Sequence, residues 1–226
     1  MNLAASVSEN QSISLLMLDS HRLFTAGLES LIRGVDDISV VGCIQSPREL
    51  SASIGLFQVD VIVMGLDFEN FDPFRSIPDW RKEHPGGRLL VLSGHDEEIY
   101  AERLIRAGAS GYISKSSEFE DLLDAIRRVA KGELAVSPTI ARHLLNNYTG
   151  NASSRDKNKD LSALTDRELQ VLTLIAKGCS TVTIANQMSI GKKTVDTYKE
   201  RIKSKLSIQT SMQLTQYAGR VIGISL

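Results

Sequence analysis

The sequence contains no run of about 18 apolar residues, the length that a helix needs to cross the hydrocarbon core of a membrane. We therefore expect no membrane span. Residues 1–12 are polar and lack a basic start followed by an apolar stretch, so we do not expect a signal peptide either. Both absences favour a cytoplasmic protein.

Cysteine is scarce, with only Cys43 and Cys179 in 226 residues. Neither stands at a metal-ligand or redox spacing, which excludes a disulfide framework and gives no basis for a metal centre. We interpret both as small side chains in a core or at a helix end, in a reducing compartment.

A third absence concerns phosphate binding. No glycine-rich loop of the P-loop or dinucleotide-binding kind follows any of the predicted strands. A nucleotide-dependent enzyme is therefore disfavoured, and we expect neither a catalytic residue nor a cofactor.

The two ends of the chain differ in charge, although the whole has a net charge of −1. Residues 1–148 contain 14 Lys and Arg against 21 Asp and Glu, which is −7. Residues 149–226 contain 12 Lys and Arg against 6 Asp and Glu, which is +6. A basic C-terminal unit is suited to binding a phosphate backbone, and its acidic neighbour can attract it.

Apolar runs alternate with helical periodicity through the first half of the chain. Strands are predicted at residues 13–18, 38–44, 59–64, 88–92 and 111–113, with helices between and after them. This alternation indicates an α/β domain at residues 13–133, with a five-stranded, doubly wound parallel sheet in the flavodoxin-like order. In such sheets the functional residues lie at the carboxyl ends of the strands.

Between the two halves, Ser137 and Pro138 begin another predicted helix that reaches about Tyr148. Residues 149–161 are polar and have no periodicity, so we interpret them as a flexible linker. Residues 134–161 therefore form a linker helix and linker, and residues 162–226 form a second, all-helical domain.

The second domain begins with a clear helix signal. Thr165 with Glu168 three positions later makes a capping box, and Gly178 ends the helix that follows. A short helix at about 181–188, a turn at 189–191 and a helix at about 192–206 come next. The third helix presents a mostly basic outer face, which comprises Lys192, Lys193, Thr194, Asp196, Thr197, Lys199, Glu200 and Lys203.

Two short helices joined by a tight turn, the second basic and exposed, form the arrangement that docks in the DNA major groove. The alternative from spacing alone is a small helical bundle whose lysines are only solvated. The amino-acid sequence of this stretch resembles the helix-turn-helix of the LuxR/FixJ/NarL transcription factors. The matching elements are Leu164-Thr165, Arg167-Glu168, Val171-Leu172, Ile175-Ala176, Gly178, Ile184-Ala185, Lys193-Thr194-Val195, Ile202 and Lys205-Leu206. The resemblance implies a dimer bound to double-stranded promoter DNA.

The first domain resembles the receiver of a two-component response regulator. Asp19 matches the acidic turn of that family, Ser93 its phosphate-sensing hydroxyl, Tyr112 its rotating aromatic and Lys115 its lysine. Two positions depart from the family pattern. Gly65 stands where the aspartate that accepts phosphate is expected, and Ser20 replaces the second acid of the metal-binding turn.

These departures bear on the chemistry of the site. Glycine has no side chain to phosphorylate, and Mg²⁺ prefers several oxygen ligands that usually include carboxylates. We therefore predict a degenerate receiver without bound metal, in which Asp19 and Lys115 pair with each other. It would serve as a platform for dimerisation, or sense a partner regulator or small ligand instead of phosphate.

Three alternatives remain open from the sequence. Asp67 could replace Gly65 as the phosphoryl acceptor, which would keep a phosphorylation switch. Trp80, beside Arg81 and Lys82, could stack on a base, as in a receiver that binds a cyclic dinucleotide. Lastly, Asp196 and Glu200 lie on the outer face and repel phosphate, which would suit a protein that has lost DNA binding.

Overall fold

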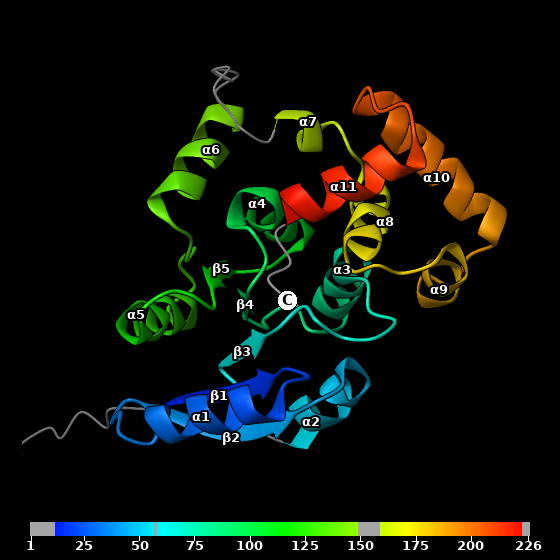
Figure 1. Cartoon of the computed structure of the whole chain (residues 1–226). Helices are drawn as coiled ribbons and strands as arrows, with labels where there is room; N and C mark the ends of the chain where they lie inside the picture. The colour runs from blue at the N-terminus through cyan, green and yellow to red at the C-terminus, as the bar shows by residue number, and fades with distance from the viewer. Residues whose placement is uncertain (1–11, 57, 149–158, 223–226) are drawn as a thin grey trace, which may run out of the picture.

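The computed structural model describes residues 12–56, 58–148 and 159–222 (Figure 1). Five parallel strands form one sheet in the order β2-β1-β3-β4-β5. This is the flavodoxin-like order predicted from the sequence. The strands are β1 (Ile13–Leu18), β2 (Ile38–Ile44), β3 (Val61–Met64), β4 (Leu89–Ser93) and β5 (Gly111–Ser114).

Helices cover both faces of the sheet, because consecutive strand residues point to opposite sides. Leu15 and Met17 of β1 pack in one core with α1 and α5, whereas Leu16 and Leu18 pack in the other with α2, α3 and α4. These helices are α1 (Arg22–Ile32), α2 (Leu50–Leu56), α3 (Pro73–Glu83), α4 (Glu97–Ala107) and α5 (Phe119–Ala130).

Local signals set where several of these helices begin and end. Ser46 accepts a hydrogen bond from the backbone of Arg48 and opens the short 3-10 turn η1 (Pro47–Glu49) that leads into α2. Asp96 caps α4 in the same way, and Gly108, at φ 115°, ends it in the left-handed region. The predicted helix boundaries are therefore confirmed to within a few residues here.

The C-terminal half is helical throughout the part that the structure describes. Its elements are α6 (Pro138–Tyr148), α7 (Lys159–Ser162), α8 (Asp166–Ala176), α9 (Thr181–Gln187), α10 (Lys192–Lys205) and α11 (Ser211–Ile222). The capping box of Thr165 and Glu168 is present, and Gly178 has φ 74° after α8. Leu172, Ile184 and Val195 are fully buried where α8, α9 and α10 meet.

The predicted linker is wrong at its C-terminal end. Residues 159–161 belong to α7, and Leu161 is buried rather than solvated. Burial of the apolar Leu161 side chain against the module stabilises the folded chain. The polar residues that flank Leu161 in the sequence did not indicate this burial. The rest of the linker, 149–158, lies outside the described residues, so its flexibility and the domain boundaries remain predictions.

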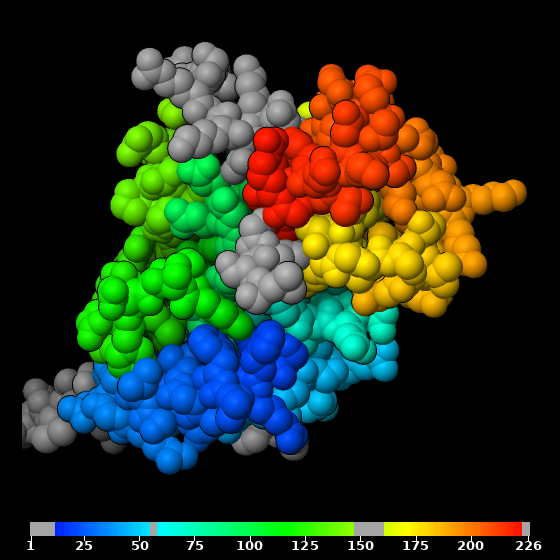
Figure 2. Space-filling view, in the orientation of Figure 1, coloured from blue at the N-terminus to red at the C-terminus, as the bar shows by residue number. Residues whose placement is uncertain are grey.

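The two halves pack against each other through a shared core. One continuous cluster of buried apolar residues includes Trp80 and Tyr100 from the first half and Leu169 and Leu172 from the second. Figures 1 and 2 show α8 and α11 seated beside α3 and α4. Over the described ranges, no helix combines the length and the hydropathy that a membrane crossing requires.

Candidate functional site

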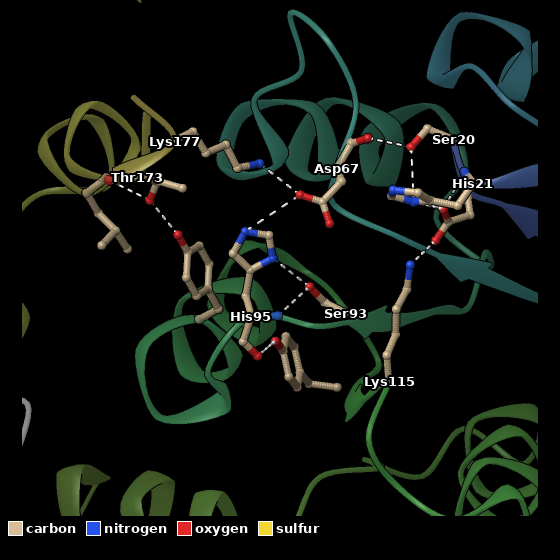
Figure 3. Close-up of polar contacts among 12 residues, drawn as sticks. Ser20, His21, Asp67, Ser93, His95, Lys115, Thr173 and Lys177 are labelled. Carbon is tan, nitrogen blue, oxygen red and sulfur yellow. Dashed lines mark hydrogen bonds and ion pairs between the residues drawn. The ribbon is translucent and has the colours of Figure 1, made fainter. Parts of the chain in front are cut away.

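Several polar side chains meet at the carboxyl edge of the sheet (Figure 3). Asp19 follows β1, and Lys115 follows β5. Although 96 positions separate them, the Lys115 ammonium donates to Oδ2 of Asp19 at 2.6 Å. The predicted pairing of these two residues is therefore confirmed.

The second oxygen of Asp19 is also engaged. Oδ1 accepts from the backbone N–H of His21 at 2.8 Å and lies 2.8 Å from Nδ1 of the same residue. His21 is the N-cap residue of α1. With both oxygens bonded and the residue only 5% exposed, Asp19 is held in one place.

Gly65 lies directly after β3 and against this pair. A Cβ atom built there would stand 2.3 Å from Oδ2 of Asp19, far inside van der Waals contact. The carboxylate of Asp19 therefore fills the space in which a side chain at position 65 would begin.

Ser20 and Asp67 join the turn after β1 to the loop after β3. The Ser20 hydroxyl donates to the backbone carbonyl of Asp67 at 2.6 Å. The Asp67 carboxylate points the other way, with Oδ1 2.8 Å from Nζ of Lys177 and 3.8 Å from Nε2 of His95. Burial acts to raise the pKa of Asp67, but the Lys177 hydrogen bond and the charges of His95, Lys177 and Lys115 together lower it.

His95 connects Asp67 to the end of β4. Its Nδ1 lies 2.8 Å from Oγ of Ser93, and its backbone carbonyl accepts from the Tyr112 hydroxyl at 2.7 Å. Burial, and then the charges of Lys177 and Lys115, lower the pKa of His95 despite the attraction of Asp67. The ring is therefore neutral near pH 7. Burial also raises the pKa of Tyr112, which remains a phenol.

The second candidate site is the outer face of α10. Six of its eight predicted residues are exposed: Lys192, Lys193, Thr194, Asp196, Thr197 and Glu200. Lys199 and Lys203 are half-buried. Lys199 donates to Oγ1 of Thr181 at 2.6 Å, and Lys203 pairs with Glu200 at 2.8 Å. In Figure 1, α10 lies on the side of its module away from the sheet, so this face is open.

Comparison with known proteins agrees with both halves of this architecture. Residues 15–127 match the response regulator receiver domain, and residues 162–218 match the bacterial regulatory proteins of the luxR family. Response regulator protein VraR of Staphylococcus aureus is 32% identical over 209 residues, which cover 92% of this chain and 96% of VraR. The chain is a LuxR-family response regulator.

One further relative supports this assignment, and one solved structure shows the same fold. Response regulator GacA of Pseudomonas syringae is 30% identical over 92% of this chain and 96% of its own. RcsB from Salmonella enterica, solved on a promoter with a phosphomimetic, superposes with a TM-score of 0.72 over 93% of this chain and 100% of RcsB. At 20% identity, the latter likeness shows the fold alone.

In this LuxR-family regulator, the structure gathers all six predicted receiver residues at one edge of the sheet. Three residues that complete the cluster were not predicted from the sequence: His95, Lys177 and Tyr100, whose ring centroid lies 4.8 Å from that of His95. His95 lies two positions after Ser93 at a strand end, which was an available signal. Lys177 carried no such signal, because it lies 110 positions from Asp67.

A cavity of about 540 Å³ opens beside this region, between α2 and α3. Trp80 lines it and is only 7% exposed, and its Nε1 has no hydrogen-bond partner among the residues that the structure describes. The indole therefore belongs to the core, and stacking on a base at the surface, as considered from the sequence, does not fit this position. Among the described residues of the lining, Arg48 is the only basic one, beside the acidic Glu69, Asp79 and Glu83.

Proposed function

We propose that this protein is a transcriptional regulator that binds promoter DNA in the cytoplasm as a homodimer, without conventional aspartyl phosphorylation. The open basic face of α10 supports the DNA-binding part, since an exposed helix with lysines at its start suits a major groove. Relatives point the same way. RcsB has been solved on promoter DNA, and also as two dimers on two parallel DNAs.

One observation carries the proposal of a phosphorylation-independent receiver. At the end of β3 the chain has Gly65, and the carboxylate of Asp19 already occupies the adjoining space. An acyl phosphate needs a carboxylate at that position, and Mg²⁺ is usually held by one or two carboxylates that are free to bind it. Asp19, with both oxygens bonded to Lys115 and His21, offers little to a metal.

The switch residues of the family pattern support the same conclusion. Ser93, the expected phosphate-sensing hydroxyl, already bonds His95. Tyr112, the expected rotating aromatic, is 2% exposed and donates to the carbonyl of the same residue. Since both groups have partners inside the chain, a phosphoryl group is not required to hold them.

The test is incubation with acetyl phosphate and Mg²⁺, followed by intact-protein mass and DNA affinity. We expect no mass gain of one phosphoryl group and the same affinity with and without the donor. A receiver with the usual aspartate, treated in parallel, serves as the positive control. Gly65→Asp alone should restore little, whereas Gly65→Asp with Ser20→Asp rebuilds both missing carboxylates.

Asp67 as a substitute acceptor is the competing function. The positive charge of Lys115 acts on the Asp67 carboxylate and lowers its pKa. However, this carboxylate is hydrogen-bonded to Lys177 and would have to break that bond to react. A phosphoryl gain on the wild type that Asp67→Asn abolishes, together with tighter DNA binding, would replace our proposal with this one.

Binding of a cyclic dinucleotide receives less support from the cavity between α2 and α3. Three carboxylates against one arginine repel a ligand with two phosphates. Titration calorimetry with a cyclic dinucleotide should therefore show no heat of binding. Saturable binding that Arg48→Ala removes would contradict this expectation.

A further inference from the structure

The loop after β3 makes an ion pair with the helix-turn-helix module. Nζ of Lys177, just after α8, lies 2.8 Å from Oδ1 of Asp67 (Figure 3). The two side chains are 35% and 30% exposed, so water screens the pair only in part. The carboxyl edge of the sheet, where the predicted receiver residues gather, is therefore in direct contact with the helix-turn-helix module.

Asp67 is held from the receiver side before Lys177 reaches it. The Ser20 hydroxyl binds the backbone carbonyl of Asp67, and His95 stands behind its carboxylate with the ring fixed by Ser93. A carboxylate with few available positions loses little conformational entropy when it pairs. Lys177 therefore meets a preorganised acceptor.

Further contacts between receiver and module fix the direction of α8. Arg103 of α4 binds Oδ1 of Asp166 at 2.7 Å and the carbonyls of Leu161 and Leu164 at 2.8 and 2.9 Å. The hydroxyl oxygens of Tyr100 and Thr173 lie 2.5 Å apart in a buried position. These bonds are spread along one face of α8, from Asp166 at its start to Lys177 just after its end, so the module can neither slide nor rotate without breaking some of them.

The contact does not cover the outer face of α10, whose residues 192–194, 196 and 197 remain exposed. A contact that grips α8 and leaves α10 free controls the orientation of the module without blocking its DNA face. Helix-turn-helix dimers that bind two half-sites must place their two recognition helices about one helical turn of DNA apart. A fixed orientation lowers the entropy cost of binding two half-sites together.

We propose that Asp67 and Lys177 are positioning residues for DNA binding. Their ion pair, together with Arg103 and Tyr100, orients the helix-turn-helix module on the receiver. In this role the ion pair replaces the phosphoryl group that a conventional receiver would use. The inference rests on the proposed DNA-binding function and extends it to residues outside the DNA face.

The test uses full-length protein and a duplex selected from random sequences by the wild type, with two half-sites or with one. Asp67→Lys and Lys177→Asp should each weaken binding to the two-site duplex about tenfold. They should leave single-site binding within about twofold of a control. The double exchange, Asp67→Lys with Lys177→Asp, should recover most of the lost affinity, because it recreates the pair with reversed polarity.

The matched control for Lys177→Asp is Lys82→Asp on α3, which makes the same change in net charge at an exposed lysine of the receiver. Small-angle scattering should show a larger radius of gyration for the two single variants only. Thermal unfolding verifies that each variant is folded.

Each remaining outcome is decisive. If the double exchange binds no better than Lys177→Asp, Lys177 contacts DNA phosphate directly and the positioning role is wrong. Single variants that bind more tightly would mean that the contact restrains the module, which also overturns the proposal. A wild type that selects no duplex would reject the proposed function itself, and scattering would still report whether the ion pair holds the module.

Discussion

At the residue scale, position 65 shows how one missing side chain shapes its surroundings. Gly65→Asp must displace the Asp19 carboxylate, because the new Cβ would start 2.3 Å from Oδ2. Overpacking of this kind costs about 1–3 kcal/mol, and the displaced Asp19 would also weaken its bond with Lys115. We expect the urea midpoint of unfolding to fall accordingly.

Gly86→Asp is the control for this change. It also adds a carboxylate at a glycine, but a Cβ there meets no atom within 4 Å. Its effect should stay within about 0.5 kcal/mol of the wild type, as for most surface substitutions. Equal losses for the two variants would show that the added charge matters, and that the contact with Asp19 does not.

Glu168 is a second residue with a separable role. It is 2% exposed and accepts from Lys205 at 2.7 Å, a bond that ties the start of α8 to the end of α10. Glu168→Gln removes the charge from this hydrogen bond, so unfolding at pH 7 should become easier by about 1.5–3 kcal/mol. Glu200→Gln, which alters an exposed pair with Lys203, should change stability by less than about 1 kcal/mol.

The effect of Glu168 should also depend on pH in a defined direction. Burial acts to raise its pKa, but the hydrogen bonds from Lys205 and Thr165 lower it overall. A lowered pKa gives stability that is present above the ordinary glutamate value and is lost as the pH falls through the folded value. Urea titrations at pH 7 and pH 4 should therefore show the wild type and Glu168→Gln converging in acid.

At the element scale, α10 combines positions with different expected roles. Lys193 is exposed near the start of the helix, where it can reach phosphate, so Lys193→Ala should weaken binding to all sequences. Thr197 faces outward one turn later and should contact bases, so Thr197→Ala should alter the preference among sites by roughly 1–3 kcal/mol. Lys199→Ala should also weaken binding generally, and it additionally breaks a bond to Thr181.

Competition binding on selected and random duplexes at several salt concentrations separates these roles. The quantity to compare is the slope of the logarithm of the binding constant against the logarithm of the salt concentration. Loss of one phosphate contact should reduce this slope by about one unit for Lys193→Ala, and not for Thr197→Ala. Equal losses on both duplexes for all three variants would mean that α10 does not read sequence.

At the scale of the whole molecule, His95 couples stability to pH because the packed module helps to bury it. Burial lowers its pKa, so the unfolded chain takes up a proton before the folded chain does. Stability should therefore decrease as the pH falls from the ordinary histidine value toward the lowered one. Melting temperatures between pH 7.5 and 5.5 should fall more steeply for the wild type than for His95→Gln. Parallel curves would show that His95 contributes nothing to this dependence.

Local signals in the sequence specify the helices and strands of this protein. Apolar runs and helical periodicity indicated the five strands and most of the helices, and the capping box at Thr165 and Glu168 marked the start of α8. These signals are local, since caps and periodicity depend on residues only a few positions apart. The resemblance to the receiver family also led to the predicted pairing of Asp19 and Lys115, and this pairing is present.

The way in which the two units meet could not be predicted from the sequence. Lys177 and Asp67 are 110 positions apart, and Arg103 and Asp166 are 63 apart, with no periodicity to connect them. The polar residues before Leu161 suggested a linker, yet Leu161 is buried and its carbonyl binds Arg103. Contacts of this kind depend on how two finished surfaces fit in charge and shape, which is a property of the assembled fold and not of any short stretch of sequence.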